Sequence, residues 1–554
     1  MPVVRQDLWA GFFLSVMYLF AFILLSMFAP HAWAQVDATT AGEMVYRQGV
    51  LPSGKSLRGE RGFGVPVEGG EAACVNCHRR SGLGTLEGQI VIPPITGKYL
   101  FRVNGSRRIE DMDFRFGTGI NSHREPYTGA TLARAIREGV GKEGQKLGPL
   151  MPHFQMDDAT MASLIAYLKT LSTGPVPGVS DDTLHFATII TPDADPAKRQ
   201  GMLDVLNQFF TAKNEFLRAG KRPLQANLSV RYRVTRRWQL HVWQLSGPPD
   251  SWEQQLHQFL AEEPVFAVIS GLGGKTWAPV HRFCESEAIP CLLPNVDLPV
   301  VAEKDFYPIY FTKGVLLEAK LISQALQKNS AQAGMKRVAQ VYREGDVGEN
   351  AAKELVAAWG NEGLASVNYV IKAGATKREL AEILKHIEDG DALILWLRAE
   401  DLRSLPSGSV RSRSVYVSGL MGEMENSPLP ATWRRVARMT YPLDLPELRK
   451  ARMNFPLGWF KIRSIPVVAE RTQADTYLAC GILAETLTGM QDSFVRDYLV
   501  ESIESMLSYR TVTGHYPRLG LAPGQRFASK GGYFVHFAEP EGTRLVADSD
   551  WIVP

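Results

Sequence analysis

The spacing of apolar residues differs between three parts of the chain. Residues 8–28 are almost continuously apolar, and residues 128–171 carry apolar side chains three and four positions apart. The second spacing is that of amphipathic helices. From residue 183 onward, short β-branched runs alternate with helical stretches. This alternation predicts a doubly wound α/β architecture with parallel sheets.

Two helices are predicted between residues 128 and 171. Thr128 is suited to cap a helix that ends at Gly139, and Asp157 or Asp158 is suited to cap the next one. The first helix carries its apolar stripe at Leu132, Ala135 and Ile136. The stripe of the second consists of Met161, Leu164, Ile165, Leu168 and Leu171.

The α/β part begins after a linker. Residues 174–182 contain Gly, Pro and Ser with few apolar side chains. Strands are expected at 184–190, 228–234, 266–270, 338–342, 367–371, 392–397 and 415–419. Helices are expected at 196–217, 251–261, 276–286, 313–327, 349–359, 377–388 and 473–488. Roughly 370 residues are too many for one such sheet, so 183–554 is predicted to form two lobes.

The first 34 residues have the pattern of a secretory signal peptide. Arg5 precedes the apolar stretch, and Ala32-Trp33-Ala34 provides small residues for cleavage. The alternative is an uncleaved membrane anchor, because the stretch is long enough to span a bilayer. Under either interpretation the rest of the chain lies outside the cytoplasm, and we expect it in the periplasm.

Charge and cysteine content narrow the function classes. The 554 residues carry a formal net charge of +3 and no long run of like charge, which gives no indication of nucleic-acid binding. Five cysteines are too few for a disulfide scaffold of this size.

The most specific motif is residues 74–78, Cys-Val-Asn-Cys-His. Cys-x-x-Cys-His is the attachment signature of c-type haem. On a helical turn, Cys74 and Cys77 are spaced to add to the two vinyl groups of one haem, and His78 then becomes the proximal iron ligand. Zinc is the alternative, but it requires two further ligands at finger-like spacing, and the chain lacks a second pair of this kind. A single haem c is therefore the predicted cofactor.

The iron requires a sixth ligand from further along the chain. Met151 lies in the run Gly-Pro-Leu-Met-Pro-His-Phe at 148–154. A methionine sulfur stabilises ferrous iron and raises the potential, as suits an electron carrier. Met156 and His153 are the alternatives.

Residues 38–173 resemble a class I cytochrome c. The resemblance rests on the 74–78 motif, Pro93-Pro94, the run 134–139, Met151-Pro152 and the run 166–171. It implies a small all-α haem domain with a proximal His78 and a distal Met151. It also implies that a proline carbonyl, that of Pro94, holds the proximal ring. The segment between Ser81 and Tyr127 is longer than in a minimal cytochrome.

Residues 183–554 resemble a type I periplasmic binding protein of the branched-chain amino-acid receptor kind. The residues that carry this resemblance are the runs 266–274, 289–294, 338–342 and 474–479. It implies two α/β lobes with a small-molecule ligand between them, at the carboxyl ends of the strands.

The same resemblance implies a set of ligand-binding residues. Ser270 and Gly271 match a turn that offers backbone N–H groups to a carboxylate, and Asn295 begins the next element. Asp297 would repel an amino-acid carboxylate, which argues against that ligand. Tyr342 and Trp396 lie at strand ends, where they would line the cleft or belong to the core.

Cys284 and Cys291 lie at a helix end and at the following strand. The resemblance implies that they bridge these two elements as a disulfide. The alternative is two small buried thiols.

Together, the two resemblances imply a periplasmic protein with no enzymatic activity of its own. The cytochrome transfers single electrons, and the lobes bind a small ligand or a redox partner. Such fusions resemble proteins associated with PQQ-dependent alcohol oxidation, in which a quinoprotein dehydrogenase delivers electrons to the haem. The alternative is the solute receptor of an ABC transporter with a haem sensor module. A haem peroxidase is disfavoured, because the chain has one haem motif and Met151 would close the iron.

Overall fold

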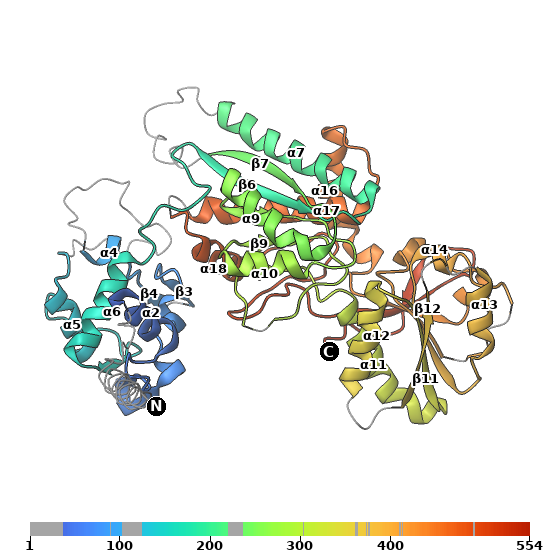
Figure 1. Ribbon diagram of the computed structural model, residues 1–554, viewed down its shortest axis with the longest axis horizontal. Coiled ribbons are helices and arrows are strands. Elements are labelled where there is room, and N and C mark those ends of the chain that lie inside the picture. The colour runs from blue at the N-terminus through green and yellow to red at the C-terminus, as the bar shows by residue number, and fades with distance from the viewer. Residues whose placement is uncertain are drawn as a thin grey trace, which may run out of the picture. The chain divides into compact units, whose positions relative to one another are not determined.

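The computed structural model describes residues 37–88, 90–101, 125–219, 236–302, 304–359, 364–372, 374, 377–408, 411–412, 414–490 and 493–554. The described residues divide into two compact units, 37–174 and 175–554, and each is treated by itself (Figure 1). The signal sequence 1–34 and the expected strand 228–234 lie outside these ranges. No helix among the described residues is long and apolar enough to cross a membrane.

The first unit is built around two packed helices. Its helices are α2 (Ala38–Gln48), α3 (Val75–His78), α4 (Gly97–Phe101), α5 (Gly129–Glu138) and α6 (Asp158–Thr170). Helix α2 crosses α6 at Gly42, where a Cβ atom would lie 2.1 Å from the Ser163 carbonyl oxygen. The backbones can therefore approach this closely only because residue 42 is glycine.

The predicted helix ends of this unit are confirmed. Thr128 and Thr131 form a capping box at the start of α5, and Gly139 ends it with a φ of 65°. The Asp157 carboxylate accepts a hydrogen bond from the Thr160 N–H at 2.7 Å, so Asp157 and not Asp158 is the N-cap of α6.

The expectation that this unit is all-α is wrong. Strands β1 (Arg58–Arg61), β2 (Val65–Glu68) and β5 (His153–Gln155) form an antiparallel sheet, and β3 (Thr85–Glu87) pairs with β4 (Ile90–Ile92). Phe63 and Gly64 turn the chain between β1 and β2 with φ angles of 67° and 73°. Two consecutive left-handed residues are incompatible with a helix and reverse the chain into a hairpin.

The first lobe of the second unit contains a parallel sheet in the order β10-β9-β8-β6-β7. Its strands are β6 (Thr183–Ile190), β7 (Arg237–Gln244), β8 (Ala267–Ile269), β9 (Cys291–Leu292) and β10 (Pro308–Ile309). Its helices are α7 (Pro196–Ala219), α9 (Trp252–Glu262), α10 (Ala278–Ser286), α16 (Pro446–Ile462), α17 (Glu470–Met490) and α18 (Arg496–Leu507). Before β6, the predicted linker already contacts this lobe, because the His185 N–H donates to the Gly178 carbonyl at 2.9 Å.

The second lobe contains the sheet β12-β11-β13-β14-β15-β16-β17, in which β11 to β15 are parallel and the last two strands are antiparallel. The strands are β11 (Arg337–Arg343), β12 (Ala365–Ile371), β13 (Asp391–Trp396), β14 (Ser414–Val417), β15 (Ala437–Tyr441), β16 (Tyr533–Phe537) and β17 (Leu545–Ala547). The helices are α11 (Val315–Ala333), α12 (Val347–Trp359), α13 (Lys377–Lys385), α14 (Ala399–Leu402) and α15 (Ala431–Arg434).

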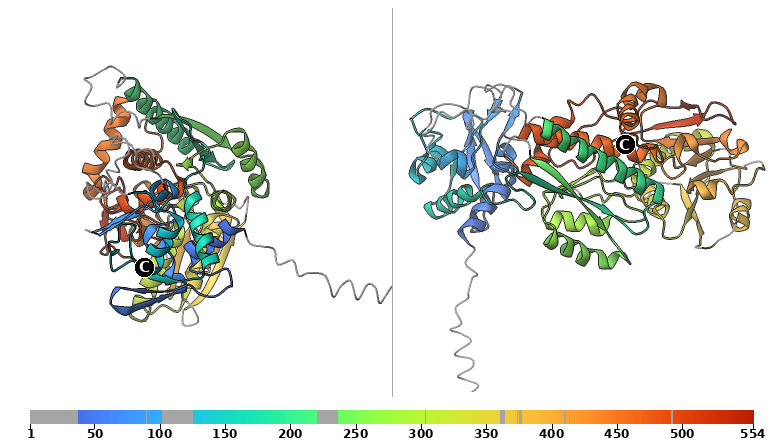
Figure 2. Two further views of the ribbon diagram at one scale, coloured as in Figure 1. Left: turned by 90° about the vertical axis from the view of Figure 1, so that its left-hand side faces the viewer. Right: turned by 90° about the horizontal axis from the view of Figure 1, so that it is seen from above.

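The two-lobed α/β architecture expected for 183–554 is confirmed. The chain passes between the lobes in three segments, which follow β10, β15 and α18. Because of these crossings, α17 packs against α7 although more than two hundred residues separate them in the sequence (Figures 1 and 2).

Candidate functional site

The 74–78 motif forms the short helix α3 and the residue before it. Cys74 stands at the N-cap, and Cys77 and His78 lie on the helix. Both cysteines are partly buried, whereas the His78 side chain is buried. The Asn76 side chain donates to the Gly70 carbonyl at 2.7 Å and thereby fixes the start of this turn.

The His78 ring is oriented by a backbone carbonyl. Its Nδ1 lies 3.0 Å from the Pro93 carbonyl oxygen, so Nδ1 carries the proton and Nε2 is left as the metal-binding atom. Burial lowers the pKa of His78 to about 4, although this hydrogen bond opposes the shift, and the imidazole is neutral at pH 7. The assignment of this role to Pro94 is wrong by one residue, because two adjacent prolines offer two carbonyls and the backbone turns the first one toward the ring.

Met151 lies in a turn that is tied to the β1–β2 hairpin. Its N–H donates to the Gly148 carbonyl at 3.0 Å, and the Gly62 N–H donates to the Pro149 carbonyl at 2.8 Å. The Met151 side chain packs against the same hydrophobic core as Cys74.

The two alternative iron ligands differ in position. His153 is exposed, and its ring lies against the α5 C-cap at Gly139, so it is not available to a buried iron. Met156 packs against the core, like Met151.

The donor set of this unit fits a haem better than a bare metal ion. Cys74, Met151 and Met156 pack against one hydrophobic core, and Cys77 and the neutral His78 lie beside Cys74 on α3. Haem is a large apolar group that combines these thiol, imidazole and thioether ligands. Among the described residues, no group of three or more His, Cys, Asp or Glu is arranged to hold a metal ion. This arrangement offers no support for a zinc site.

Ser270 does not have the anion-binding role expected of it. It is fully buried after β8, and its N–H donates to the Leu292 carbonyl at 2.9 Å. Its hydroxyl donates to Thr476 at 2.9 Å and accepts from Asn295. At Gly271 a Cβ atom would lie 2.4 Å from the Trp277 ring, so this turn is packed against the lobe. The glycine therefore serves close packing and not ligand approach.

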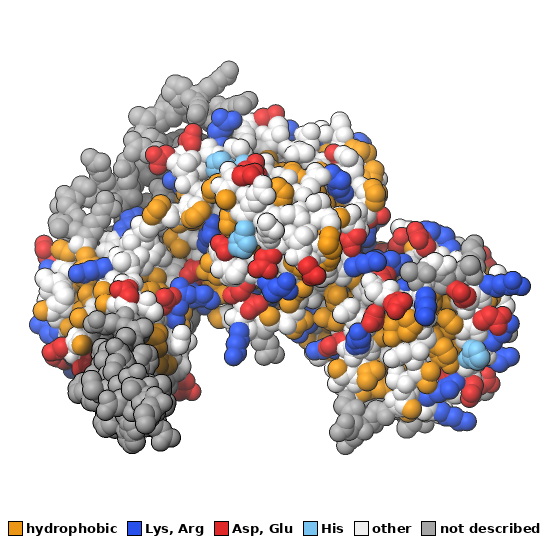
Figure 3. All heavy atoms as spheres, in the orientation of Figure 1, with side chains coloured by type: hydrophobic (Ala, Val, Ile, Leu, Met, Phe, Trp, Pro, Cys, Tyr) orange, Lys and Arg blue, Asp and Glu red, His pale blue; other side chains and the backbone are white. Residues whose placement is uncertain are grey.

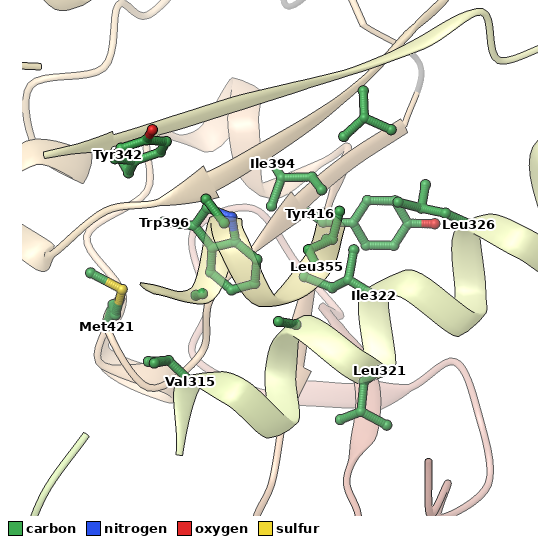
Figure 4. Close-up of a cluster of buried hydrophobic side chains, with 14 of the residues drawn as sticks. Val315, Leu321, Ile322, Leu326, Tyr342, Leu355, Ile394, Trp396, Tyr416 and Met421 are labelled. Atoms are coloured by element: carbon green, nitrogen blue, oxygen red, sulfur yellow. The ribbon is translucent and has the colours of Figure 1, made fainter. Parts of the chain in front are cut away.

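Tyr342 and Trp396 are core residues and do not line the cleft. Both side chains are buried in the cluster between the second sheet and helices α11 and α12 (Figure 4). The Trp396 Nε1 donates to the buried Gln340 side chain at 2.9 Å. Strands β11 and β13 are buried on both faces, so their terminal side chains are enclosed as well.

One cavity between the lobes is small and has mixed polar and apolar lining. It has a volume of about 20 Å³, enough for about one water molecule. Asn295 lines it together with Arg471, Asp475 and Tyr516, and Leu420 lines it from the second lobe. A ligand-binding role for Asn295 stays a prediction. This cavity has no room for an amino acid, but a larger cleft of about 440 Å³ lies between Trp277 of the first lobe and Asn350 and Lys353 of the second.

A chain of ion pairs links the two lobes beside this cavity. Asp297 of the first lobe accepts from Arg471 at 3.4 Å and from Arg398 of the second lobe at 3.3 Å. Arg398 also donates two bonds of 2.8 Å to Asp346. Burial alone would raise the pKa of Asp297, but Lys198, Arg471 and Arg398 outweigh it and lower this pKa to about 2.

The sequence alone does not predict this chain of ion pairs. Asp346 and Arg398 follow predicted strands and Arg471 precedes a predicted helix, whereas no predicted element places Asp297. Asp297 itself was noted, but only as a residue that repels carboxylates. Its partners come from segments 101 and 174 positions away.

Cys284 and Cys291 are adjacent in space, on α10 and β9. Both are buried, and their thiols share a hydrogen bond. Burial, with a further contribution from Cys291, raises the pKa of Cys284. Both are present as thiols, and the disulfide stays a prediction.

No protein-family model and no curated protein matches the chain. Solved structures similar to it include a possible leucine/isoleucine/valine-binding protein from Rhodopirellula baltica (15% identity, 68% of this chain and 98% of that chain, TM-score 0.47). Others are a fatty acid ABC transporter substrate-binding protein from Thermomonospora curvata (16%, 69% and 95%, 0.47) and the substrate-binding protein LivJ from Streptococcus pneumoniae (10%, 67% and 100%, 0.46). At these scores the assignment of two α/β lobes rests on the strand order described above.

Proposed function

We propose that the first unit is a mono-haem cytochrome c that transfers single electrons in the periplasm. When bound, the haem supplies a one-electron Fe(III)/Fe(II) couple. Cys74 and Cys77 would attach it, His78 would provide the proximal ligand and Met151 the distal one. The chain itself contributes the orientation of the ligands and the apolar surroundings that keep water from the iron.

The observation that carries this proposal is the orientation of His78. An imidazole next to a Cys-x-x-Cys pair, with Nδ1 on the Pro93 carbonyl, presents Nε2 as a neutral ligand. A hydrogen bond of this kind fixes the ring and increases the basicity of the ligand. A histidine with a merely structural role would not require two thiols on the same turn.

Covalent haem attachment is the direct test. The full chain would be expressed in the periplasm together with a cytochrome c maturation system and examined by haem staining of a denaturing gel and by intact mass. We expect one haem per chain, lost in the Cys74→Ser, Cys77→Ser variant. Cys480→Ala is the matched control and should retain haem, because Cys480 is buried in the other unit. A wild-type chain without covalent haem would refute the proposal.

The proposed electron donor to the haem is a quinoprotein dehydrogenase. The resemblance of the fusion to proteins of PQQ-dependent alcohol oxidation suggests a quinoprotein dehydrogenase as the partner. Reduction of the oxidised haem by such an enzyme and its alcohol, followed in a stopped-flow spectrometer, tests this partner. A rate no faster than with an unrelated quinoprotein would exclude it.

A second candidate function is a solute receptor of an ABC transporter with a haem sensor. The observation that favours it is the polar cavity between the lobes, lined by Asn295 and Arg471. A ligand in this cavity would have to part the lobes, because the cavity holds only about 20 Å³, whereas the neighbouring cleft of about 440 Å³ is open without such a movement. Calorimetry with a panel of amino acids and fatty acids tests this function. Tight binding of a ligand that also changes the haem potential would support the sensor. Tight binding that leaves the haem potential unchanged would mean that ligand binding and electron transfer are independent functions.

A further inference from the structure

Helix α16 carries an exposed apolar stripe. Leu448, Phe455 and Ile462 are 59%, 57% and 79% exposed, and they recur every seven residues. Ala451 and Gly458 are also exposed and lie between them, three residues after Leu448 and Phe455. A Cβ atom at Gly458 would meet nothing within 4 Å. Apolar or small residues at alternating spacings of three and four form the contact line of a two-stranded coiled coil.

The opposite face of the helix anchors it to the first lobe. Arg449, Met453, Pro456 and Phe460 are buried, and Phe460 belongs to a small cluster with Val205 of α7. The stripe therefore lies on the outward face of a helix that packs against the lobe. Hydrophobic side chains are visible at this edge of the lobe in the space-filling view (Figure 3). A lone exposed apolar residue is ordinary, but a continuous line over four helical turns indicates an interaction surface.

We propose that α16 pairs with α16 of a second copy of the chain, antiparallel, to form a two-fold symmetric dimer. The sizes of the side chains support this occupant. In antiparallel pairing, Phe455 packs on Ala451 of the second copy, and Leu448 packs on Gly458 of the second copy. Leu448 and Phe455 then each meet a small residue, and Ile462 extends past the start of the second copy's helix. Parallel pairing would set Phe455 against Phe455 and Gly458 against Gly458, with a clash at one level and a gap at the other.

Charges beside the stripe select the same register. Glu447 and Lys461 are exposed and flank the stripe on one side, with Asn454 halfway between them. In the antiparallel pair, Glu447 of each copy faces Lys461 of the other, and the two Asn454 side chains meet on the two-fold axis. A surface that is complementary to itself in size and in charge is what an isologous dimer requires.

The dimer should be weak. One helix pair of this length buries less than the ~1,200 Å² of total surface found in stable complexes. We therefore expect the haem-loaded mature chain to sediment as a monomer at low concentration and to shift toward twice its mass as the concentration rises. Phe455→Glu should abolish the shift. Tyr509→Glu is the matched control, because Tyr509 is 86% exposed and lies elsewhere on the surface.

Cross-linking tests the antiparallel register. With a short bismaleimide, Asn454→Cys should give a covalent dimer, whereas Glu447→Cys should not, because two copies of residue 447 would lie about 20 Å apart. Equal cross-linking of both variants would overturn the antiparallel arrangement.

Exchanging the charges is a second test of the register. Glu447→Lys alone should abolish dimerisation, and the double variant Glu447→Lys, Lys461→Glu should restore it. A wild-type chain that stays monomeric at every concentration would overturn the proposal, and a Phe455→Glu variant that dimerises like the wild type would do the same. Circular dichroism confirms in each case that the variant is folded.

Discussion

Glu318 is a buried carboxyl group with no positively charged partner among its hydrogen-bonded neighbours. It lies on α11 with its side chain fully enclosed, and it interacts with Ser418 at 2.5 Å, Thr440 at 2.7 Å and the Leu420 N–H at 3.0 Å. Burial raises the pKa of Glu318 to about 7, although these hydrogen bonds favour the charged form. The second lobe should therefore become less stable as this carboxyl ionises.

The size of the effect follows from linkage. A pKa of about 7 in the folded chain against 4.5 in the unfolded chain corresponds to about 3 kcal/mol. Below pH 4.5 Glu318 is protonated in both the folded and the unfolded chain, and no stability is lost. Between pH 4.5 and 7 the unfolded chain releases its proton first, so the free energy of unfolding falls, and above pH 7 the loss is complete. Glu318→Gln keeps the shape and the hydrogen bonds but cannot ionise.

The assay is denaturant unfolding of the wild type and of Glu318→Gln at pH 5, 6, 7 and 8, followed by tryptophan fluorescence. The stability of the variant relative to the wild type should rise by about 2.5 kcal/mol from pH 5 to pH 8, because part of the effect is already present at pH 5. Glu349→Gln is the control. The pKa of Glu349 is lowered by Lys353, so it is ionised in both states above pH 5 and no trend is expected. A constant difference between Glu318→Gln and the wild type across this range would refute the reasoning.

Three further predictions concern stability. The pKa of Asp297 is about 2 in the folded chain and 3.8 in the unfolded chain. The free energy of unfolding of the wild type should therefore fall by about 2 kcal/mol between pH 4 and pH 2. In the same acid titration, the Asp297→Asn variant should show no such loss. Asp157→Ala removes the α6 cap and should cost about 1 kcal/mol in the thermal unfolding of the first unit, with a smaller loss for Asp158→Ala. Gly42→Ala drives a methyl group into the Ser163 carbonyl and should cost about 1–3 kcal/mol in the same assay.

Local signals in the sequence predicted local structure well. Thr128, Gly139 and Asp157 act through hydrogen bonds to residues a few positions away. The neighbouring sequence is therefore enough to predict their roles as helix caps. The buried parallel strands β11 and β13 lie where expected, and both are apolar except for Gln340 and the charged residues at their ends. Strand β7 was missed, because Arg237–Gln244 mixes charged, polar and aromatic residues at a sheet edge.

Features that depend on distant segments could not be predicted. Ser270 is occupied by Thr476, which lies 206 positions away, and this contact turns an expected ligand site into part of the packing between β8 and α17. The same holds for Asp297, whose charge is neutralised by arginines from another lobe and another helix. Trp396 was assigned correctly to a strand end, but its burial depends on α11 and α12 packing over the sheet.

The absorption spectrum of the oxidised and reduced haem-loaded protein, with and without Met151→Ala, tests the central claim most directly. If His78 and Met151 ligate the iron, the oxidised wild type shows the weak far-red sulfur-to-iron band and binds carbon monoxide poorly when reduced, and the variant loses the band and binds carbon monoxide. Met156→Ala should leave both properties unchanged. A wild type that lacks the band, or that binds carbon monoxide readily, would contradict a closed electron-transfer site.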